Sequence, residues 1–311
     1  MKFALFLGCH IPVRLKQYET SAKAILERLG VGLVDIEEFN CCGYPLRNIE
    51  FKAFLLTSAR NLSLAEKKKL DVMTLCQCCY GALKKANFLL RENASLRKEV
   101  NAVLEREGLP YEGGVEVKHL LYVLHQEVGV EAIKKKIVKT FKGLKIAAHY
   151  GCHVLRPSQV VRFDDPVKPS IFDQLVEATG AESIVWPMKL ECCGAPLWGI
   201  HDELSTEFTL KKLKNARESG ADYLCSACTY CQMQFDTVQQ MILSQRGLNH
   251  PLPSILYSQL LGLNLGIDGE VLGLGMNQIP IGNIENTLYE ITAEVKEKSF
   301  GDGIASSYEN H

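Results

Sequence analysis

The chain has 311 residues, a formal net charge of −1, 47% hydrophobic and 23% charged residues, the proportions of ordinary globular proteins. Its length predicts about two domains, and the small net charge argues against nucleic-acid binding, which needs a basic surface. No stretch approaches the ~18 uninterrupted apolar residues of a membrane span, and the five apolar residues 3–7 are too few for a signal peptide. We therefore expect a soluble, cytoplasmic protein without direct membrane insertion, whose cysteines are free thiols rather than disulfides.

The first half of the chain is predicted to alternate strands with helices. One helix is amphipathic, with Ala22, Ile25 and Leu29 on one side, and Gly30 ends it. The expected elements are a strand over 2–7, a helix over 16–30, a strand over 32–36, a helix over 48–69 and a strand over 71–75.

The second half repeats this order. Its expected elements are a strand over 145–149, a helix over 170–180, a strand over 183–186, a helix over 202–219 and a strand over 222–224. Alternating strands and helices indicate parallel sheets with right-handed crossovers. The predicted fold class is therefore α/β, with two tandem, pseudo-symmetric domains that have small parallel sheets flanked by helices.

Ten of the twelve cysteines form two copies of one pattern. Each copy has a lone Cys, then Cys-Cys-Gly-x-Pro, then Cys-x-x-Cys. The first copy holds Cys9, Cys41, Cys42, Cys76 and Cys79, and the second holds Cys152, Cys192, Cys193, Cys228 and Cys231. Such a repeat over half a chain length indicates a duplicated metal- or redox-binding unit.

The cysteines follow the predicted strands. Ligands of open parallel α/β sheets bind outside the carboxyl ends of strands, so the thiols of each half should converge on one sheet edge. Gly43 and Gly194 permit tight turns there, and Pro45 and Pro196 stiffen the two loops.

Several metal and redox sites match the cysteine pattern less well than a larger cluster does. A structural zinc site needs four thiolates and would leave one thiol per half unused. A thioredoxin-like site needs one Cys-x-x-Cys and leaves the vicinal pairs unexplained. The close C-x2-C-x2-C run of bacterial four-iron sites is not completed after Cys231, where Gln232 follows. Five ligands per half fit a larger or more distorted cluster, and the chemistry of the residues alone goes no further.

The motifs Gly8-Cys9, Cys41-Cys42-Gly43, Gly151-Cys152-His153 and Cys192-Cys193-Gly194, with both Cys-x-x-Cys elements, resemble the B subunit of heterodisulfide reductase. The resemblance covers residues 1 to about 265 and extends to all five cysteines of each half. It implies two noncubane [4Fe-4S] clusters, each bound by the five cysteines of one half. It also implies a substrate disulfide cleaved between them, either the coenzyme M–coenzyme B heterodisulfide of methanogenesis or an analogue.

The same resemblance implies partners. An iron–sulfur subunit of the reductase complex would deliver electrons and a flavin-bearing subunit would supply them, with a small-molecule disulfide as substrate. An electron-relay protein of a related oxidoreductase complex is the alternative, since the cysteine-rich domains with a Cys-Cys-Gly motif (CCG domains) that the resemblance implies occur there too. A zinc or structural scaffold is the third possibility.

Other residues carry weaker expectations. His10 and His153, each directly after a lone Cys, are candidates for proton supply or for hydrogen bonds to the cluster ligands; the alternative is an ordinary loop histidine. Cys78 and Cys225 lie outside the repeat and are expected to be buried thiols; the alternative for Cys225 is that it replaces a repeated cysteine as a ligand.

The expected domain division is 1–143, 144–265 and a Gly-rich, polar extension over 266–311. Within that extension we expect a helix over 284–298 and a disordered end over 301–311.

Overall fold

The computed structural model describes residues 1–290 and contains two four-stranded parallel sheets. The first sheet has the order β2-β1-β3-β4 and the second has the order β7-β6-β8-β9. In each sheet the chain adds strands first to one side and then to the other, so the order switches between β1 and β3 and between β6 and β8. Such a switch point creates a ligand crevice at the carboxyl ends of the strands. The expected α/β class, with small parallel sheets flanked by helices, is confirmed.

The first sheet and its helices come from the first 136 residues. The strands are β1 (Lys2–Phe6), β2 (Gly32–Asp35), β3 (Asp71–Thr74) and β4 (Val117–His119). The helices are α1 (Ile11–Arg14), α2 (Lys16–Leu29), α3 (Phe51–Lys67), α4 (Gln77–Glu92), α5 (Ala94–Leu104), α6 (Leu120–Tyr122), which continues as the π-helix η3 (Val123–Gly129), and α7 (Val130–Lys136).

The second sheet repeats this layout after a crossing strand. That strand is β5 (Lys139–Phe141), and the sheet contains β6 (Lys145–Ala148), β7 (Glu182–Ser183), β8 (Tyr223–Ser226) and β9 (Ser254–Leu256). The helices are α8 (Ser158–Val161), α9 (Ile171–Glu177), α10 (Asp202–Glu218), α11 (Thr229–Met233), which continues as the π-helix η5 (Gln234–Val238), α12 (Gln239–Arg246) and α13 (Tyr257–Asn264).

Helix α2 shows how the sequence pattern produces the packing. Ala22, Ile25 and Leu29 repeat at helical spacing and are buried, as expected. Gly30 follows in the left-handed conformation, with φ of 79°, and its amide donates to the carbonyl oxygens of Glu27 and Leu26. A glycine ends the helix here because other residues adopt this conformation only at a cost in free energy.

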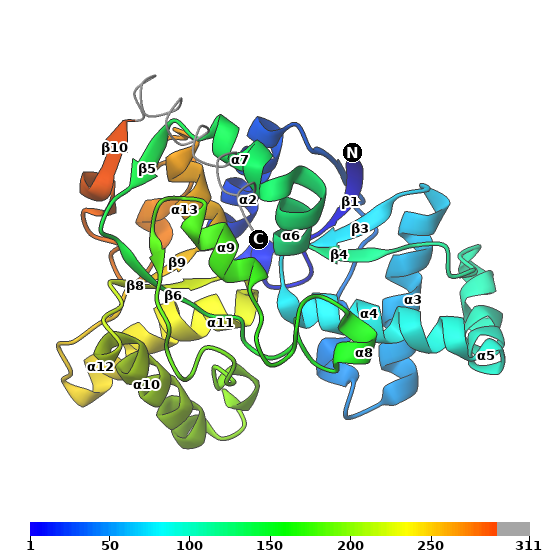
Figure 1. Cartoon of the computed structure of the whole chain (residues 1–311). Helices are drawn as coiled ribbons and strands as arrows, with labels where there is room; N and C mark the ends of the chain where they lie inside the picture. The colour runs from blue at the N-terminus through cyan, green and yellow to red at the C-terminus, as the bar shows by residue number, and fades with distance from the viewer. Residues whose placement is uncertain (291–311) are drawn as a thin grey trace, which may run out of the picture.

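The helix that follows the last sheet strand of each half packs against a helix of the other half. Helix α13, after β9, lies against α2, where Ser258 Oγ and Ser21 Oγ are 2.6 Å apart. Helix α6, after β4, lies against α9 in the corresponding contact. In Figure 1 the two sheets consequently lie side by side, β1, β3 and β4 on the right and β6, β8 and β9 on the left.

The strand expected over 183–186 is shorter than predicted. Strand β7 ends at Ser183, and Ile184 makes one more backbone hydrogen bond to Ile146. The Trp186 indole N–H then donates to the carbonyl oxygen of Ala148 at 3.1 Å. The Trp186 side chain thus occupies the Ala148 carbonyl oxygen that a backbone amide of the strand would otherwise use. The regular ladder of backbone hydrogen bonds therefore stops.

The helix expected over 284–298 is wrong in the part that the structure describes. Residues Ile284–Thr287 form a short 3₁₀ turn, and Leu288–Glu290 form strand β10, which pairs antiparallel with β5. Residues 291–298 of that expectation lie outside the described residues, as does the expected disorder over 301–311. Helix α13 is missed by the sequence patterns, because all eight of its residues are buried and it has no polar side to create a period.

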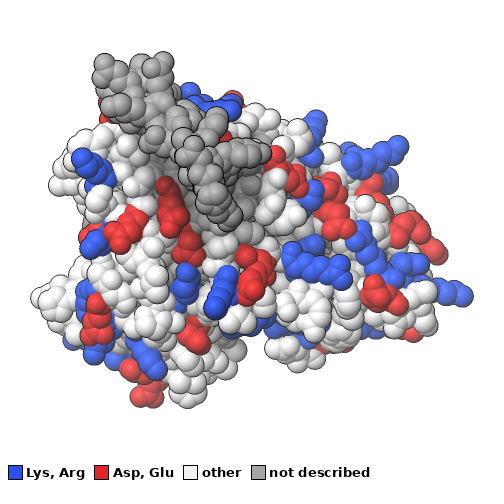
Figure 2. Space-filling view, viewed as in Figure 1, with Lys and Arg blue, Asp and Glu red and all other residues white. Residues whose placement is uncertain are grey.

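The surface carries both signs of charge. On the face shown in Figure 2, acidic and basic side chains are interspersed and neither gathers into one large patch. Within residues 1–290, none of the helices is both long enough and apolar enough to cross a bilayer.

Candidate thiolate centre

The lone cysteines, the vicinal pairs and the first cysteine of each Cys-x-x-Cys element lie in the loops after the strands, as predicted, and Cys79 and Cys231 lie in the first turn of the helices that follow. Cys9 and Cys76 follow the neighbouring strands β1 and β3, while Cys41 and Cys42 follow β2. The second half places its repeated cysteines after β6, β7 and β8 in the same way. All twelve cysteines are free thiols in the structure.

The first five thiols form one connected chain, which we name the first thiol set. Cys9 Sγ lies 3.9 Å from Cys41 Sγ. Interactions between neighbouring thiols then shift the pKa values of Cys41, Cys42 and Cys79, and they link Cys41 to Cys42, Cys42 to Cys79, and Cys79 to Cys76. The lone cysteine, the vicinal pair and the Cys-x-x-Cys element therefore meet at one place.

The second thiol set repeats this chain link for link. Interactions between neighbouring thiols shift the pKa values of Cys152, Cys192 and Cys231, and they link Cys152 to Cys192, Cys192 to Cys193, and Cys231 to Cys228. Cys231 Sγ lies 3.5 Å from Cys193 Sγ, which completes the series. Thus the same order of thiols recurs in both halves.

The two thiol sets touch each other. Cys76 Sγ of the first set lies 4.0 Å from Cys228 Sγ of the second. Cys78, outside the repeat, lies beside this junction, and its Sγ is within 4.8 Å of both. The structure therefore brings all ten repeated cysteines into one region between the halves, and adds Cys78 to it.

The two candidate histidines reach across this junction in matching ways. His10 follows the lone Cys of the first half, and its Nε2 lies 3.2 Å from Tyr230 Oη of the second half. His153 follows the lone Cys of the second half, and its Nδ1 lies 3.5 Å from Cys78 Sγ and 3.4 Å from Cys152 Sγ. Tyr44 packs between them, in edge contact with the His153 ring and tilted against Tyr230.

The first thiol of each vicinal pair ionises readily. Hydrogen bonds from Cys42 and Cys9 lower the pKa of Cys41 to about 2. Hydrogen bonds from Cys152 and Cys193 lower the pKa of Cys192 to the same value, about 2. The Gly43 and Gly194 amides also donate to these sulfurs, both at 3.4 Å. Each set therefore holds at least one preformed thiolate, the form in which cysteine binds metal.

Buried polar atoms without partners surround the thiols. Among residues 1–290, four buried side-chain polar atoms have no hydrogen-bond partner, and three of them stand next to cysteines: Gln77 Nε2, Thr229 Oγ1 and His149 Nδ1. Gln77 and Thr229 each follow the first Cys of a Cys-x-x-Cys element. Buried donors are normally paired, so the Gln77 amide and the Thr229 hydroxyl fit an additional acceptor such as the sulfide of an inorganic cluster.

Cys225 differs from the other cysteines. It lies inside β8, is fully buried, and its pKa is raised by burial. Its backbone carbonyl accepts from the His149 amide at 2.9 Å. No thiol of the described residues is bonded to it, so it is a core residue, as expected.

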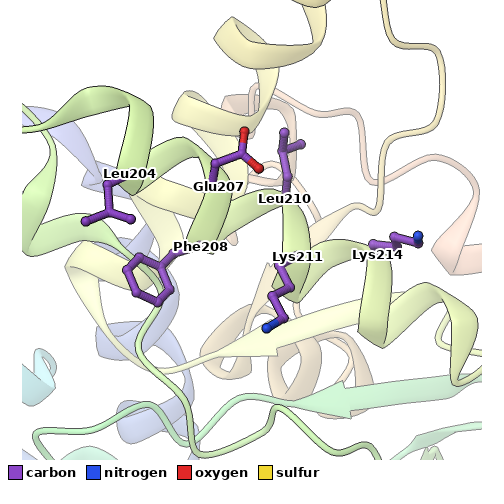
Figure 3. A pocket seen from close by; sticks show the side chains of 6 residues that line it. All are labelled: Leu204, Glu207, Phe208, Leu210, Lys211 and Lys214. Carbon is purple, nitrogen blue, oxygen red and sulfur yellow. The ribbon is translucent and has the colours of Figure 1, made fainter.

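A hollow along α10 does not belong to the thiolate centre. It has a volume of about 410 Å³, and its lining side chains are those of Leu204, Glu207, Phe208, Leu210, Lys211 and Lys214. Figure 3 shows that all six come from this one helix. No cysteine lines it.

Comparison with known proteins identifies the family. A family model described as a cysteine-rich domain (CCG) matches residues 3–84 and again residues 146–236. The chain belongs to this cysteine-rich CCG family. It is 36% identical to the B subunit of the "Ferredoxin/F(420)H(2)-dependent CoB-CoM heterodisulfide reductase" of Methanosarcina acetivorans, over 95% of this chain and 99% of that protein. The predicted resemblance is thereby confirmed.

Two further comparisons bear on function and on fold. The chain is 34% identical to the "8-methylmenaquinol:fumarate reductase membrane anchor subunit" of Wolinella succinogenes, over 89% of this chain and 97% of that protein. A solved structure of a hypothetical protein from Helicobacter pylori matches with a TM-score of 0.70, covering 89% of this chain and 51% of that chain. At 19% identity, that last match concerns the fold alone.

Sequence reasoning missed several residues of the centre. Tyr44, Tyr230 and His149 were not singled out, and Cys78 was expected to be only a buried thiol. A signal for Tyr230 and Cys78 exists, because each is the third residue of its Cys-x-x-Cys element. Their contacts across the halves could not be predicted, since the repeat does not specify how its two copies face each other.

Proposed function

We propose that the chain is the catalytic subunit of a heterodisulfide reductase complex, with one noncubane [4Fe-4S] cluster held by each thiol set. The observation that carries this proposal is the junction of two identical five-thiol chains at Cys76 and Cys228. The CCG relatives of the chain, whose names include the B subunit of a heterodisulfide reductase, support it. The proposed substrate is the coenzyme M–coenzyme B heterodisulfide or an analogue.

Reduction of a disulfide takes two electrons and two protons and yields two thiols. Bound iron would supply electrons and a Lewis acid for a departing thiolate. The residues of the chain would do the rest. The first and second thiol sets would hold the metal, while His10 with Tyr230 and His153 with Cys78 stand where protons are needed at the junction. We propose these two histidines as the proton-supplying residues.

The same proposal makes this chain one subunit of a reductase complex. Because the chain has no ferredoxin-type cysteine motif, a separate iron–sulfur subunit would pass electrons to it, and a flavin-bearing subunit would feed that iron–sulfur subunit. The domain division 1–143, 144–265 and 266–311 also remains a proposal.

A second candidate function is electron relay without substrate chemistry. The similarity to a fumarate reductase subunit favours it. The two candidates differ at the junction, because a relay needs no group that binds or protonates a thiolate there. A thiol-dependent change in the spectrum of the reduced protein would separate a reductase from a relay.

The first experiment measures the metal content. We predict about eight irons and eight acid-labile sulfides per chain after purification without oxygen, because each set supplies five thiolates. Iron and sulfide are measured chemically, with zinc measured in the same samples. Stoichiometric zinc with negligible iron would contradict the proposal.

A further inference from the structure

Lys212 is a buried lysine on the outer side of the second thiol set. It lies on α10, its side chain has no exposed surface, and its Nζ donates a hydrogen bond to the carbonyl oxygen of Met188. The same ammonium lies 4.9 Å from the centre of the Trp186 ring. A fully buried lysine is rare unless an anionic group compensates its charge.

The negative groups that face Lys212 are cysteines of the second set. Burial lowers the pKa of Lys212 to about 8, while negative charge at Cys193, Cys231, Glu191 and Cys192 raises it. Among residues 1–290, Lys212 forms no ion pair with a carboxylate. Geometry places Lys212 beside the second thiol set, because its ammonium lies over the Trp186 ring, that ring is tilted against His149, and His149 Nε2 lies 3.3 Å from Cys231 Sγ.

The first half has a neutral residue at the same place. Lys212 stands nineteen positions after Cys193, and Asn61 stands nineteen positions after Cys42. The helices α10 and α3 that carry them are anchored alike, because Thr209 and Ser58 donate to the carbonyl oxygens of Cys193 and Cys42.

Asn61 makes local backbone hydrogen bonds and carries no charge. Its Nδ2 donates to the carbonyl oxygens of Cys41 and Thr57, and its Oδ1 accepts from the amide of Asn40, all at 3.0 Å. The polar capacity of this side chain is thus used within the first half.

A second asymmetry lies three residues before each lone cysteine. In the second half this residue is His149, whose Nε2 lies 3.3 Å from Cys231 Sγ. In the first half it is Phe6, a buried ring in edge contact with Phe39. At this distance the Nε2–H of a neutral imidazole can donate one hydrogen bond to a thiolate without adding charge.

Arg47, five residues after Cys42, does not cancel this difference. Its guanidinium lies over the Tyr44 ring at 5.1 Å and is partly exposed. Water screens a partly exposed charge far more than a buried one. Arg47 also lowers the pKa of His153, which belongs to the second half.

We propose that Lys212 and His149 are positioning residues that make the cluster of the second thiol set the stronger electron acceptor of the two. The inference rests on the proposed function. A reduced cluster carries one more negative charge, and a buried ammonium and a hydrogen bond to a ligating sulfur both stabilise that charge. An electron from a low-potential donor would then settle on the second cluster in preference to the first.

The test is a redox titration of the full, cluster-loaded chain, followed by electron paramagnetic resonance. The wild-type protein should show two midpoint potentials, and the signal that persists in Cys41→Ser, the one from the second set, should have the higher potential. Lys212→Met removes the charge and keeps an apolar stem against Trp186. It should lower the reduction equilibrium constant of the second cluster at least tenfold, about 59 mV for one electron, and leave the first unchanged.

Lys211→Met is the matched control, because Lys211 is the adjacent lysine of α10 and points to solvent at the hollow of Figure 3. It should leave both potentials unchanged. His149→Phe, which installs the first-half residue, should lower the second potential even if Lys212→Met does not fold. Two loaded clusters with equal or reversed wild-type potentials would overturn this inference alone. Absence of iron from the wild-type chain would overturn the proposed function together with it.

Discussion

Cys78 and Tyr230 occupy the same position in the two Cys-x-x-Cys elements, and each meets the histidine of the opposite half. Cys78 meets His153, and Tyr230 meets His10. The contacts join equivalent positions, but one pairs the Cys78 thiol with His153 Nδ1 and the other pairs the Tyr230 phenol with His10 Nε2. The duplicated chain thus keeps one scaffold while placing different proton-bearing groups on the two sides of the junction.

Cys193 and Cys225, both in the second half, should differ in whether they bind iron. Cys193→Ser should remove about half of the iron, roughly four of eight atoms per chain, because a hydroxyl replaces a thiolate poorly as an iron ligand. Cys225→Ser should leave the iron content unchanged, since its thiol lies inside β8 away from the others. Iron and sulfide analysis of both variants checks this. Equal iron loss in the two variants would show that Cys225 is a ligand.

At the scale of elements, a glycine at the end of α9 allows the crossing strand β5 to pass. Gly180 has φ of 84°, and a Cβ placed on it would lie 2.0 Å from Thr140 Oγ1 and 2.6 Å from the Phe141 carbonyl oxygen. Gly30, after α2, has a similar φ of 79° with nothing within 4 Å of such a Cβ. The two glycines share a backbone conformation and differ in their surroundings.

Gly180→Ala should therefore destabilise the protein by about 1–3 kcal/mol more than Gly30→Ala does, because only the former forces atoms together. Both variants incur the cost of the left-handed conformation, about 1–2 kcal/mol, so the comparison isolates the close contact. Denaturant unfolding of the two variants measures the difference. Equal losses would mean that β5 moves aside without cost.

Most regular elements could be predicted from the sequence because their patterns are local. Helix α2 and its end at Gly30 follow from apolar spacing and a single glycine. Strand β7 ends early because Trp186 takes a backbone acceptor, a tertiary contact that no local pattern records. The region after 284 has a helical pattern but pairs with β5, a strand more than 140 residues away in sequence.

The cysteine positions of the candidate centre could also be predicted, whereas their electrostatic surroundings could not. Spacing alone assigns the ten cysteines to two sets. The burial of Lys212 and the contact of His149 with Cys231 depend on how α10 and β6 pack. A lysine in an amphipathic helix normally faces solvent. The sequence pattern therefore predicts an exposed Lys212, whereas the structure buries it.

At the scale of the whole molecule, each half completes the other. Helices α13 and α6 each pack on a helix of the opposite half, and the thiol sets meet at Cys76 and Cys228. The first set is not enclosed by its own half alone, since Thr229 and Tyr230 line the cavity there. This arrangement explains why a duplicated unit is retained within one chain.

The most direct test of this account measures disulfide reduction with an artificial one-electron donor in Cys41→Ser and Cys192→Ser variants. If each set holds one substrate sulfur, both variants should lose turnover by at least about a hundredfold, although the remaining cluster stays intact and reducible. Cys225→Ser serves as the matched control and should retain turnover. Near-normal turnover in either Cys41→Ser or Cys192→Ser would contradict the account and favour electron relay.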